Sequence, residues 1–395
     1  MKKVVIAQAG GPTSVINATL AGFVEGTMED NKLIYSRNGY EGLTYGNFWD
    51  GTEEMNKWVI ENKHVPGACL GSGRFPLEDD YIMQCVDQLK KIQADALVVI
   101  GGNGTMEALS KMEEEAANRS YDLQVIGLPK TVDNDLGATD HAPGFASAAR
   151  YVAQTTRDIS RDLYSMRNFE QVRILETMGR NAGWLALASG FLRKYEEDGP
   201  HAILIPEKTV KKETLLQEVD RAVQKYGYAV IVVSEGVQWA DAGTGQIEKE
   251  MVNGRAILGG ISSEIELFLK EELHVMARAE LLGMNQRSSS VFVSPVDYRE
   301  AYEIGTCGGR WLKEGKNKIM VSLQRTEQFD YNISKISVDL KEVVQEGERL
   351  LPDYFIDNPQ AYYEWLEPLM GDDLLAYPSP IPRRDSHVKE PFQSK

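Results

Sequence analysis

The sequence predicts an α/β protein with two domains and a cleft between them, and three observations lead to this prediction. Short apolar runs of strand character are each followed by a glycine-rich or polar turn and then by a helical pattern. The 395 residues exceed the usual size of one domain and suit two, each with its own core. Polar groups follow the predicted strands in both halves, and open α/β sheets bind ligands at the carboxyl ends of their strands.

The composition limits the classes of partner. Acidic residues number 59 against 43 basic ones, which gives a formal net charge of −16. A surface of that sign repels nucleic acid and anionic membranes, so we expect neither as a partner, although a local cluster of cations can still hold phosphate. No apolar stretch approaches the roughly 18 residues that a membrane helix needs. Cys69, Cys85 and Cys307 show no disulfide or zinc pattern, which favours a reducing cytoplasm.

The first predicted unit is Val4–Gln8, a buried strand that ends at Gly10-Gly11 before a helical pattern. A glycine pair at such a turn lets the backbone approach an anion at the helix N-terminus. Lys32–Ser36 is predicted as the second strand. A later glycine-rich loop carries Arg74, whose planar guanidinium can reach a phosphate. Ordinary turn formation and a solvated arginine remain the alternatives for these two features.

Ala96–Ile100 carries no charge and is predicted as a central strand. It runs into Gly101-Gly102-Asn103-Gly104-Thr105, whose three glycines leave room for backbone contacts to phosphate, and a helix is expected at about 106–112. The loop is not a P-loop, since no lysine follows at the required place, and its glycine spacing differs from the dinucleotide fingerprint. We therefore predict a phosphate cradle of another type.

Residues 129–135, Pro-Lys-Thr-Val-Asp-Asn-Asp, are the motif around which we expect the site to form. They follow a short apolar strand at 124–128 and precede a helical pattern that begins near Gly144. Asp133 and Asp135 are two residues apart, so in an extended chain both carboxylates face one cleft. One carboxylate can take the proton of an attacking hydroxyl while the other orients the substrate or holds a metal ion. A polar loop in which these residues only form turns is the alternative.

Three predicted strands of the second half each end in polar groups, which indicates a second α/β layer facing the first. They are Val172–Leu175 before Met178-Gly179-Arg180, Ala202–Ile205 before Pro206-Glu207, and Ala229–Val233 before Ser234-Glu235-Gly236.

The remaining expectations concern loops, the C-terminal third and one histidine. An exposed loop is expected at 241–254, a helix at about 296–313, paired strands at Lys318–Gln324 and Ile333–Leu340 around a turn near 330–332, and a tail from Pro352 that packs over the body. We interpret His141, which lies close to residues 129–135, as structural.

The ordered set of motifs resembles the phosphofructokinase family over roughly the first 325 residues. The matching motifs are Gly10-Gly11, Gly71–Pro76, Gly101–Thr105, Pro129–Asp135, Met178–Arg180, Ser234–Gly236 and Leu282–Arg287. The resemblance implies two Rossmann-like three-layer domains with the active site in the cleft between them. A donor-binding domain would comprise residues 1–143 plus about 283–317, and a sugar-phosphate-binding domain residues 144–282 plus about 318–395.

The same resemblance implies an activity and an assembly. The expected reaction transfers a phosphoryl group to the 1-hydroxyl of fructose 6-phosphate in glycolysis and gives fructose 1,6-bisphosphate, with Mg²⁺ as cofactor. The expected protein is a cytoplasmic homodimer or homotetramer. The family's equivalent of Arg278 reaches across a subunit boundary, which implies active sites shared between subunits.

The roles that the resemblance implies fall into three groups. Asp133 matches the catalytic base, and Thr131 and Arg180 match groups that contact the transferring phosphoryl group. The donor would be bound by Gly11, Tyr40, Arg74, Phe75, Gly102, Asn103, Gly104, Thr105 and Lys130. The sugar phosphate would be bound by Thr131, Asp133, Asp135, Met178, Gly179, Arg180, Glu235, Arg278, Met284 and Arg287, and Mg²⁺ by Asn103 and Asp135.

Three positions depart from the pattern of the family. Met284 stands where ATP-dependent bacterial members have a histidine that donates to the sugar phosphate. Gln171 stands where an arginine is expected, with Arg173 as a nearby substitute. Asn103 stands where many members carry an acidic metal contact.

Two residues bear on the phosphoryl donor. Lys130 matches the lysine that the pyrophosphate-dependent members of the family carry at this position. Those members usually carry Asp at the position of Gly104, where a carboxylate would repel the α-phosphate of a nucleotide, so Gly104 leaves space for ATP. We favour ATP, with pyrophosphate as the alternative. A non-catalytic regulatory subunit that binds sugar phosphate is a further alternative, and an NAD or lipid kinase is a rival that would lack the 129–135 and 178–180 motifs.

Overall fold

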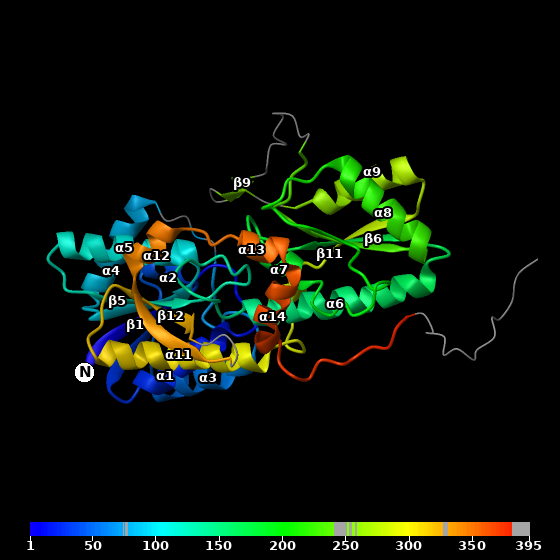
Figure 1. The fold of residues 1–395 in the computed structure, drawn as a ribbon. Coiled ribbons are helices and arrows are strands. Elements are labelled where there is room, and N and C mark those ends of the chain that lie inside the picture. The colour runs from blue at the N-terminus through cyan, green and yellow to red at the C-terminus, as the bar shows by residue number, and fades with distance from the viewer. Residues whose placement is uncertain are drawn as a thin grey trace, which may run out of the picture.

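The computed structural model describes residues 1–73, 75, 78–240, 251–252, 255–256, 259–326 and 331–380. These residues form two lobes that lie side by side, each with a sheet between layers of helices (Figure 1). The predicted two-domain α/β architecture is confirmed. Within these ranges, no helix has both the length and the apolar character that crossing a bilayer requires.

The first lobe is built on a seven-stranded sheet with the order β13-β12-β5-β4-β1-β2-β3. Five strands run parallel, and the two edge strands β3 and β13 run antiparallel to their neighbours. The central strands β4 and β5 are buried along their whole length, which is why they read as continuous apolar runs. The strands are β1 (Lys2–Gln8), β2 (Asn31–Ser36), β3 (Phe48–Asp50), β4 (Ala96–Gly101), β5 (Gln124–Pro129), β12 (Ile319–Arg325) and β13 (Ile333–Asp339).

Helices cover both faces of this sheet (Figure 1). Alternate residues of β1 point to opposite faces, so Val5 belongs to one core and Ile6 to the other. The core around Val5 includes α2 (Tyr40–Tyr45), α4 (Asp79–Lys91), α5 (Asn103–Asn118) and α12 (Leu340–Glu346). The core around Ile6 includes α1 (Ile16–Thr27), α3 (Glu53–Glu61) and α11 (Pro295–Lys313).

The second lobe contains a four-stranded parallel sheet with the order β11-β6-β8-β7. Its strands are β6 (Val172–Thr177), β7 (Ala202–Leu204), β8 (Ala229–Ser234) and β11 (Ala277–Leu281). One face packs against α6 (Phe145–Met166), α7 (Trp184–Ala188), α13 (Asp353–Asp357) and α14 (Pro359–Met370), and the other against α8 (Lys212–Tyr226) and α9 (Ile261–Leu273). The tail from Pro352 does pack on the body, as predicted, through α13 and α14.

Short elements complete the described part of the chain: the 3₁₀ turn η1 (Asn62–His64), α10 (Asn285–Ser288), and the two-residue strands β9 (Met251–Val252) and β10 (Arg255–Ala256). Most of the expected 241–254 loop, part of the expected turn at 330–332 and the end of the tail lie outside the described residues. The helix expected at about 106–112 is longer than predicted, because α5 begins at Asn103.

The segment after residue 318 does not lie where we expected it. We assigned it to the second domain, but β12 pairs in parallel with β5 and antiparallel with β13, so both strands extend the first sheet. The four central residues of β12, Met320–Leu323, are buried, and such a strand needs a neighbour and helices on both faces. β12 finds this neighbour in β5, whose other side pairs with β4. Met320 then belongs to one core of the first lobe and Val321 to the other.

Candidate active site

A cavity of about 500 Å³ is lined by residues from both lobes. The first lobe contributes the turns that follow β1, β4 and β5, and the second contributes the turns that follow β6 and β8. The lining therefore collects the carboxyl ends of parallel strands, where loop side chains and helix N-termini converge. It includes Gly10, Gly11, Tyr40, Phe75, Gly102, Asn103, Gly104, Thr105, Lys130, Thr131, Asp133, Asp135, Met178, Arg180, Glu235 and Arg287.

Asp133 and Asp135 both line this cavity, as their spacing predicted. Asn134 between them has a φ of 53°, a left-handed conformation that Asn tolerates better than most residues. The Thr131 hydroxyl donates to Asp135 Oδ1 at 2.9 Å and accepts from the Asp133 backbone N–H at 3.1 Å. One threonine thus fixes the turn that carries both carboxylates.

The cavity changes the acidity of Asp133. Burial raises its pKa well above the ordinary value of an aspartate, the carboxylates of Asp135 and Glu235 raise it further, and Arg180 and Lys130 oppose part of the rise. A pKa of about 8 makes the Asp133 carboxylate a stronger base than an ordinary aspartate, and the group ionises just above neutral pH. The arrangement therefore suits proton abstraction from a hydroxyl.

The part of the cavity next to the carboxyl ends of β1 and β4 is formed largely by glycine-rich turns. Gly10 has a φ of 74°, a left-handed conformation that favours glycine. A Cβ atom on Gly11 would come within 2.8 Å of Arg287 Nη1, the end of a flexible side chain. Lys130 Nζ donates to the Gly11 carbonyl at 2.7 Å. The first turn of α5 begins beside them at Asn103 and presents backbone N–H groups, which bind phosphate well.

The same end offers oxygen ligands for a hard cation. Asn103 Nδ2 donates to the Asp135 carbonyl at 2.7 Å, so the two residues proposed for Mg²⁺ are neighbours. Within the described ranges, no group of three or more His, Cys, Asp or Glu side chains could hold a metal ion. Mg²⁺ commonly binds through one or two carboxylates together with substrate phosphates and water, so Asp135 and Asn103 fit its needs.

The opposite wall comes from the second lobe. The Arg180 backbone N–H donates to a Glu235 carboxylate oxygen at 3.2 Å, which joins the turns after β6 and β8. Gly179 has a φ of 146°, and a Cβ atom there would lie 2.5 Å from the Ala182 carbonyl and 2.9 Å from Ser234 Oγ. Gly179 is thus not a lining residue itself but allows Met178 and Arg180 to reach the cavity.

Comparison with known proteins decides the family. The family model for phosphofructokinase matches residues 3–307. The chain belongs to the phosphofructokinase family. It is similar to a pyrophosphate-dependent phosphofructokinase structure from Marinobacter aquaeolei, with a TM-score of 0.84, 28% identity, and coverage of 100% of this chain and 99% of that one.

Two curated relatives cover nearly the whole length. A sulfofructose kinase from Alkalicoccus urumqiensis is 48% identical over 366 residues, which cover 92% of this chain and 94% of the relative. A pyrophosphate–fructose 6-phosphate 1-phosphotransferase from Rhodospirillum rubrum is 32% identical over 409 residues, which cover 98% of each. These relatives are phosphotransferases of the same family.

Some of the expected site residues lie away from the cavity. Arg278 and Met284 are both described and neither lines it. Arg278, on β11, is about half exposed and lies 3.3 Å from Glu170, and the Met284 side chain is 67% exposed. Arg74 lies outside the described residues. Most of the residues that we expected to bind the donor or the transferring phosphoryl group line the cavity. Of the residues that we expected at the 6-phosphate, Arg278 and Met284 do not.

A segment that the sequence analysis missed closes one side of the site. Val343 and Val344 on α12, together with Gly347 and Glu348, line the cavity. Glu348 forms an isolated bridge with Leu136, and the Arg349 backbone N–H donates to the Asp135 carbonyl at 2.8 Å. The segment lies some 200 residues after the catalytic turn in sequence and carries no recognisable motif, so no signal in the sequence indicated it.

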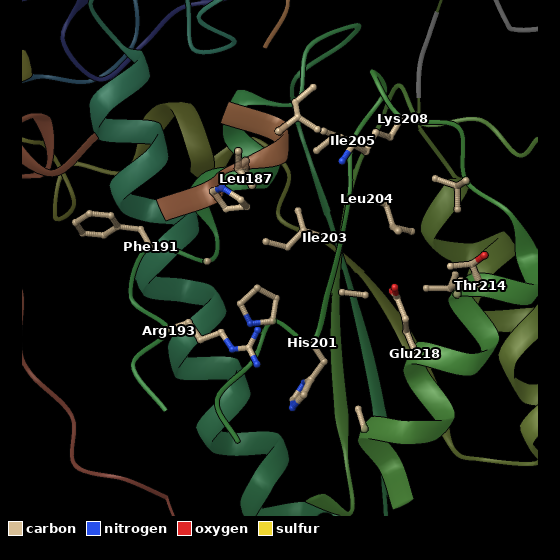
Figure 2. A pocket seen from close by; sticks show the side chains of 18 of the residues that line it. Leu187, Phe191, Arg193, His201, Ile203, Leu204, Ile205, Lys208, Thr214 and Glu218 are labelled. Carbon is tan, nitrogen blue, oxygen red and sulfur yellow. The ribbon is translucent and has the colours of Figure 1, made fainter. Parts of the chain in front are cut away.

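A larger cavity of about 1040 Å³ lies in the second lobe at the open edge of β7. In Figure 2, Leu187 and Phe191 lie on one side of the strand, and Thr214 and Glu218 lie on the other. Its charged lining mixes both signs, and it contains none of the glycine turns or paired aspartates of the smaller cavity. The chemistry therefore favours the smaller cavity as the active site.

Proposed function

We propose that this chain transfers a phosphoryl group to the 1-hydroxyl of a ketohexose that carries an acidic group at C6. Fructose 6-phosphate, the acceptor named for the Rhodospirillum rubrum relative, is the first candidate, and fructose 1,6-bisphosphate would be its product. One observation carries the proposal: Asp133 and Asp135 line one cavity together with the glycine turns after β1 and β4 and with Arg180. A second candidate acceptor is sulfofructose, named for the Alkalicoccus urumqiensis relative.

In the proposed mechanism, Asp133 accepts the proton of the 1-hydroxyl as its oxygen attacks the terminal phosphorus of the donor. The bond from phosphorus to the leaving oxygen breaks, and the rest of the donor departs with that electron pair. Arg180 and Thr131 lie where they can contact the transferring group, and a guanidinium there stabilises its charge. Glu235 and Met178 contact the sugar.

Bound Mg²⁺ would neutralise charge on the donor phosphates, and Asp135 with Asn103 would hold it. The glycine turns after β1 and β4, together with Lys130 and Tyr40, would bind the donor through backbone N–H groups and one ammonium group. The Tyr40 hydroxyl donates to the Thr105 carbonyl at 3.2 Å, so it supports the turn as well as lining the cavity.

Two observations bear on the choice of phosphoryl donor, and they point in opposite directions. Gly104 lies in the first turn of α5 and leaves space where a carboxylate would repel a nucleotide, which favours ATP. Relatives from Rhodospirillum rubrum and Xanthomonas campestris are named for pyrophosphate, which favours the smaller donor. We retain ATP as the first candidate and pyrophosphate as the second.

A homodimer or homotetramer with shared active sites is part of the proposal. Arg278 lies on the edge strand β11, is about half exposed and does not line the cavity of its own chain, as expected of a residue that acts on a neighbouring subunit. Mixing Arg278→Ala and Asp133→Ser subunits tests this, because a hybrid contains one intact site if Arg278 acts across the boundary. Activity that stays at the level of the separate variants would contradict sharing. The three cysteines are free thiols, and we retain the cytoplasm as the proposed location.

The function is tested by measuring turnover of fructose 6-phosphate and of 6-deoxy-6-sulfofructose with Mg²⁺, first with ATP and then with pyrophosphate. Formation of ADP or of inorganic phosphate reports the reaction for either sugar. We expect turnover of at least one sugar with one donor. Sugar binding without turnover in all four combinations would instead support a regulatory subunit.

A further inference from the structure

The chain crosses from the first lobe to the second between α12 and α13, and the crossing segment 347–352 passes the active-site cavity (Figure 1). Before the crossing, Leu340 and Val343 of α12 belong to a core of the first lobe, whereas Leu351 belongs to a core of the second. Gly347 ends α12 with a φ of 68°, a left-handed conformation that favours glycine. Gly347 and Glu348 both line the cavity, so the segment can contact both of its walls.

On one side, the crossing segment holds the turn that carries Asp133 and Asp135. The Arg349 backbone N–H donates to the Asp135 carbonyl at 2.8 Å. Glu348 forms an antiparallel bridge with Leu136, the residue after Asp135. The backbone of Asp135 is therefore held by a segment that lies far away in the sequence.

Close packing supports the same pairing of segments. The Ala138 backbone N–H donates to a Glu346 carboxylate oxygen at 2.6 Å. A Cβ atom on Gly137 would lie 3.0 Å from the Gly347 carbonyl oxygen, which is closer than an ordinary van der Waals contact. The segments 135–138 and 346–349 therefore lie directly against each other.

On the other side, the crossing segment contacts the turn of the second lobe that carries Arg180. The Asn181 side-chain amide donates to Glu348 Oε2 at 2.7 Å, and Asn181 directly follows Arg180 in the chain. The Trp184 indole N–H donates to the Arg349 carbonyl at 3.2 Å. Glu348 thus contacts the first lobe through its backbone and the second lobe through its carboxylate.

The backbone of Arg180 is tightly constrained within its own lobe. Its φ of 52° is left-handed, and a Cβ atom on Gly236 would lie only 1.6 Å from its carbonyl oxygen. A turn packed in this way moves together with its lobe. The position of Arg180 relative to Asp133 therefore depends on contacts between the lobes, and the hydrogen bond from Asn181 to Glu348 is such a contact, one residue from Arg180.

Phosphoryl transfer depends strongly on this kind of placement. Charged groups stabilise a transition state best when they are fixed before the reaction, and a misplacement of about 1 Å can lower the rate about 10²-fold. We propose that Glu348 is a positioning residue for the transfer: by accepting the hydrogen bond of Asn181, it holds the turn of Arg180 in place against the turn of Asp133. This inference rests on the proposed function.

A carboxylate that lines the cavity has a second way to act, through its negative charge on bound phosphates or on Mg²⁺. The two roles require different properties of residue 348. Positioning requires an oxygen that accepts from Asn181, which glutamine also provides, whereas an electrostatic role requires the charge. Substitutions at both partners of the hydrogen bond therefore separate the two roles.

The first test is a double-mutant cycle on kcat. Glu348→Ala and Asn181→Ala should each lower kcat about three- to tenfold, the range expected for the loss of one hydrogen bond. The double variant should lose no more than either single variant, because all three lack the same contact. The KM values for sugar and donor should change less than about twofold, because Arg180 acts on the group in transfer. Losses that multiply in the double variant, or an unchanged kcat in either single variant, would overturn the proposal.

The second test restores the hydrogen bond without the original charge. Glu348→Gln should recover most of the kcat that Glu348→Ala loses, because the amide oxygen still accepts from Asn181. Asn181→Asp places two carboxylates against each other and should lower kcat further than Asn181→Ala. Combining Asn181→Asp with Glu348→Gln lets the glutamine amide donate to the new aspartate and should recover most of that loss. A Glu348→Gln variant as slow as Glu348→Ala would overturn the positioning role in favour of an electrostatic one.

Controls separate positioning from folding and from the proposed function. Glu342→Ala, at an exposed acid on α12 outside the cavity lining, should leave kcat unchanged. Asn181 and Glu348 are also exposed, so their variants should fold, and urea unfolding measures the stability of each. A loss of kcat that only follows a loss of stability would overturn the positioning role and leave the proposed function standing. No turnover by the unmodified chain, with either sugar and either donor, would overturn both.

Discussion

The active-site cavity and the outer edge of the second sheet are built in different ways. The side of the cavity next to the first sheet is made of backbone turns at the ends of three buried strands, and its side chains are tied to those turns by Thr131 and Asn103. The edge strand β11 instead carries partly exposed side chains, where acids pair with Arg173 and Arg278. The difference indicates that the fold fixes the geometry of the cavity, whereas the sheet edge depends on a few replaceable side chains.

Removing the proposed base should have the largest effect. Asp133→Ser should lower kcat about 10²–10⁴-fold with little change in sugar affinity, because the side chain acts on a proton in the transition state. Asp122→Asn, at an exposed carboxylate far from the cavity lining, controls for the loss of one negative charge. Steady-state kinetics with direct sugar binding measure both quantities. An undiminished kcat would remove Asp133 from the role of base.

The turns after β1, β4 and β5 could largely be predicted, because their geometry restricts which residue types can occupy them. The positive φ of Gly10 favours glycine, and the paired aspartates follow a buried and mostly apolar strand. Strand periodicity also predicted most elements of both sheets. These features depend on residues that are close together in the sequence, so the sequence alone could predict them.

Other features depend on contacts between distant segments and could not be predicted. Nothing in the sequence of β12 distinguishes the open edge of β5 from an edge of the second sheet, so we placed it in the wrong lobe. Strand β11, Ala-Arg-Ala-Glu-Leu, lacks an apolar run because it is a partly exposed edge, and we did not identify it as a strand. The pairing of Arg173 with Glu280 follows from that same register.

The next largest effect concerns the donor alone. Gly104→Asp should lower kcat/KM for ATP about 100-fold, or by roughly 2.7 kcal/mol, because the new carboxylate faces nucleotide phosphates in a confined site. Activity with pyrophosphate should change much less. A parallel loss with both donors would show that the substitution damages the cradle rather than selecting between donors.

A smaller effect is expected at the outer edge of the second sheet. Glu280→Gln removes one acid from Arg173 and should lower the free energy of unfolding by about 0–1 kcal/mol, since a partly exposed ion pair contributes little. Glu272→Gln, at an exposed acid on α9, is the control, and chemical denaturation measures both variants. A loss well above about 1 kcal/mol would mean that Glu280 supports a network of pairs rather than one surface pair.

The smallest effect on activity, but a measurable one on stability, comes from the cluster behind the catalytic turn. His141 is buried, and its Nε2 lies 2.7 Å from a Glu300 carboxylate oxygen. Burial alone would lower the pKa of His141, but Glu300 and Asp140 raise it to about 9. The structural role predicted for His141 agrees with these contacts, since it joins the segment after Asp135 to α11.

This raised pKa fixes the sign of a pH effect on folding. A folded-state pKa above the unfolded value near 6.5 stabilises the protein fully below pH 6.5, and the contribution is lost as the pH rises towards 9. We expect the free energy of unfolding to fall by about 1–3 kcal/mol over that range. His141→Asn should be less stable at pH 6 and lose this dependence, whereas His274→Asn, at an exposed position whose φ of 54° suits Asn, should keep it. A pH dependence that persists in His141→Asn would contradict its assignment to the cluster of His141 with Glu300 and Asp140.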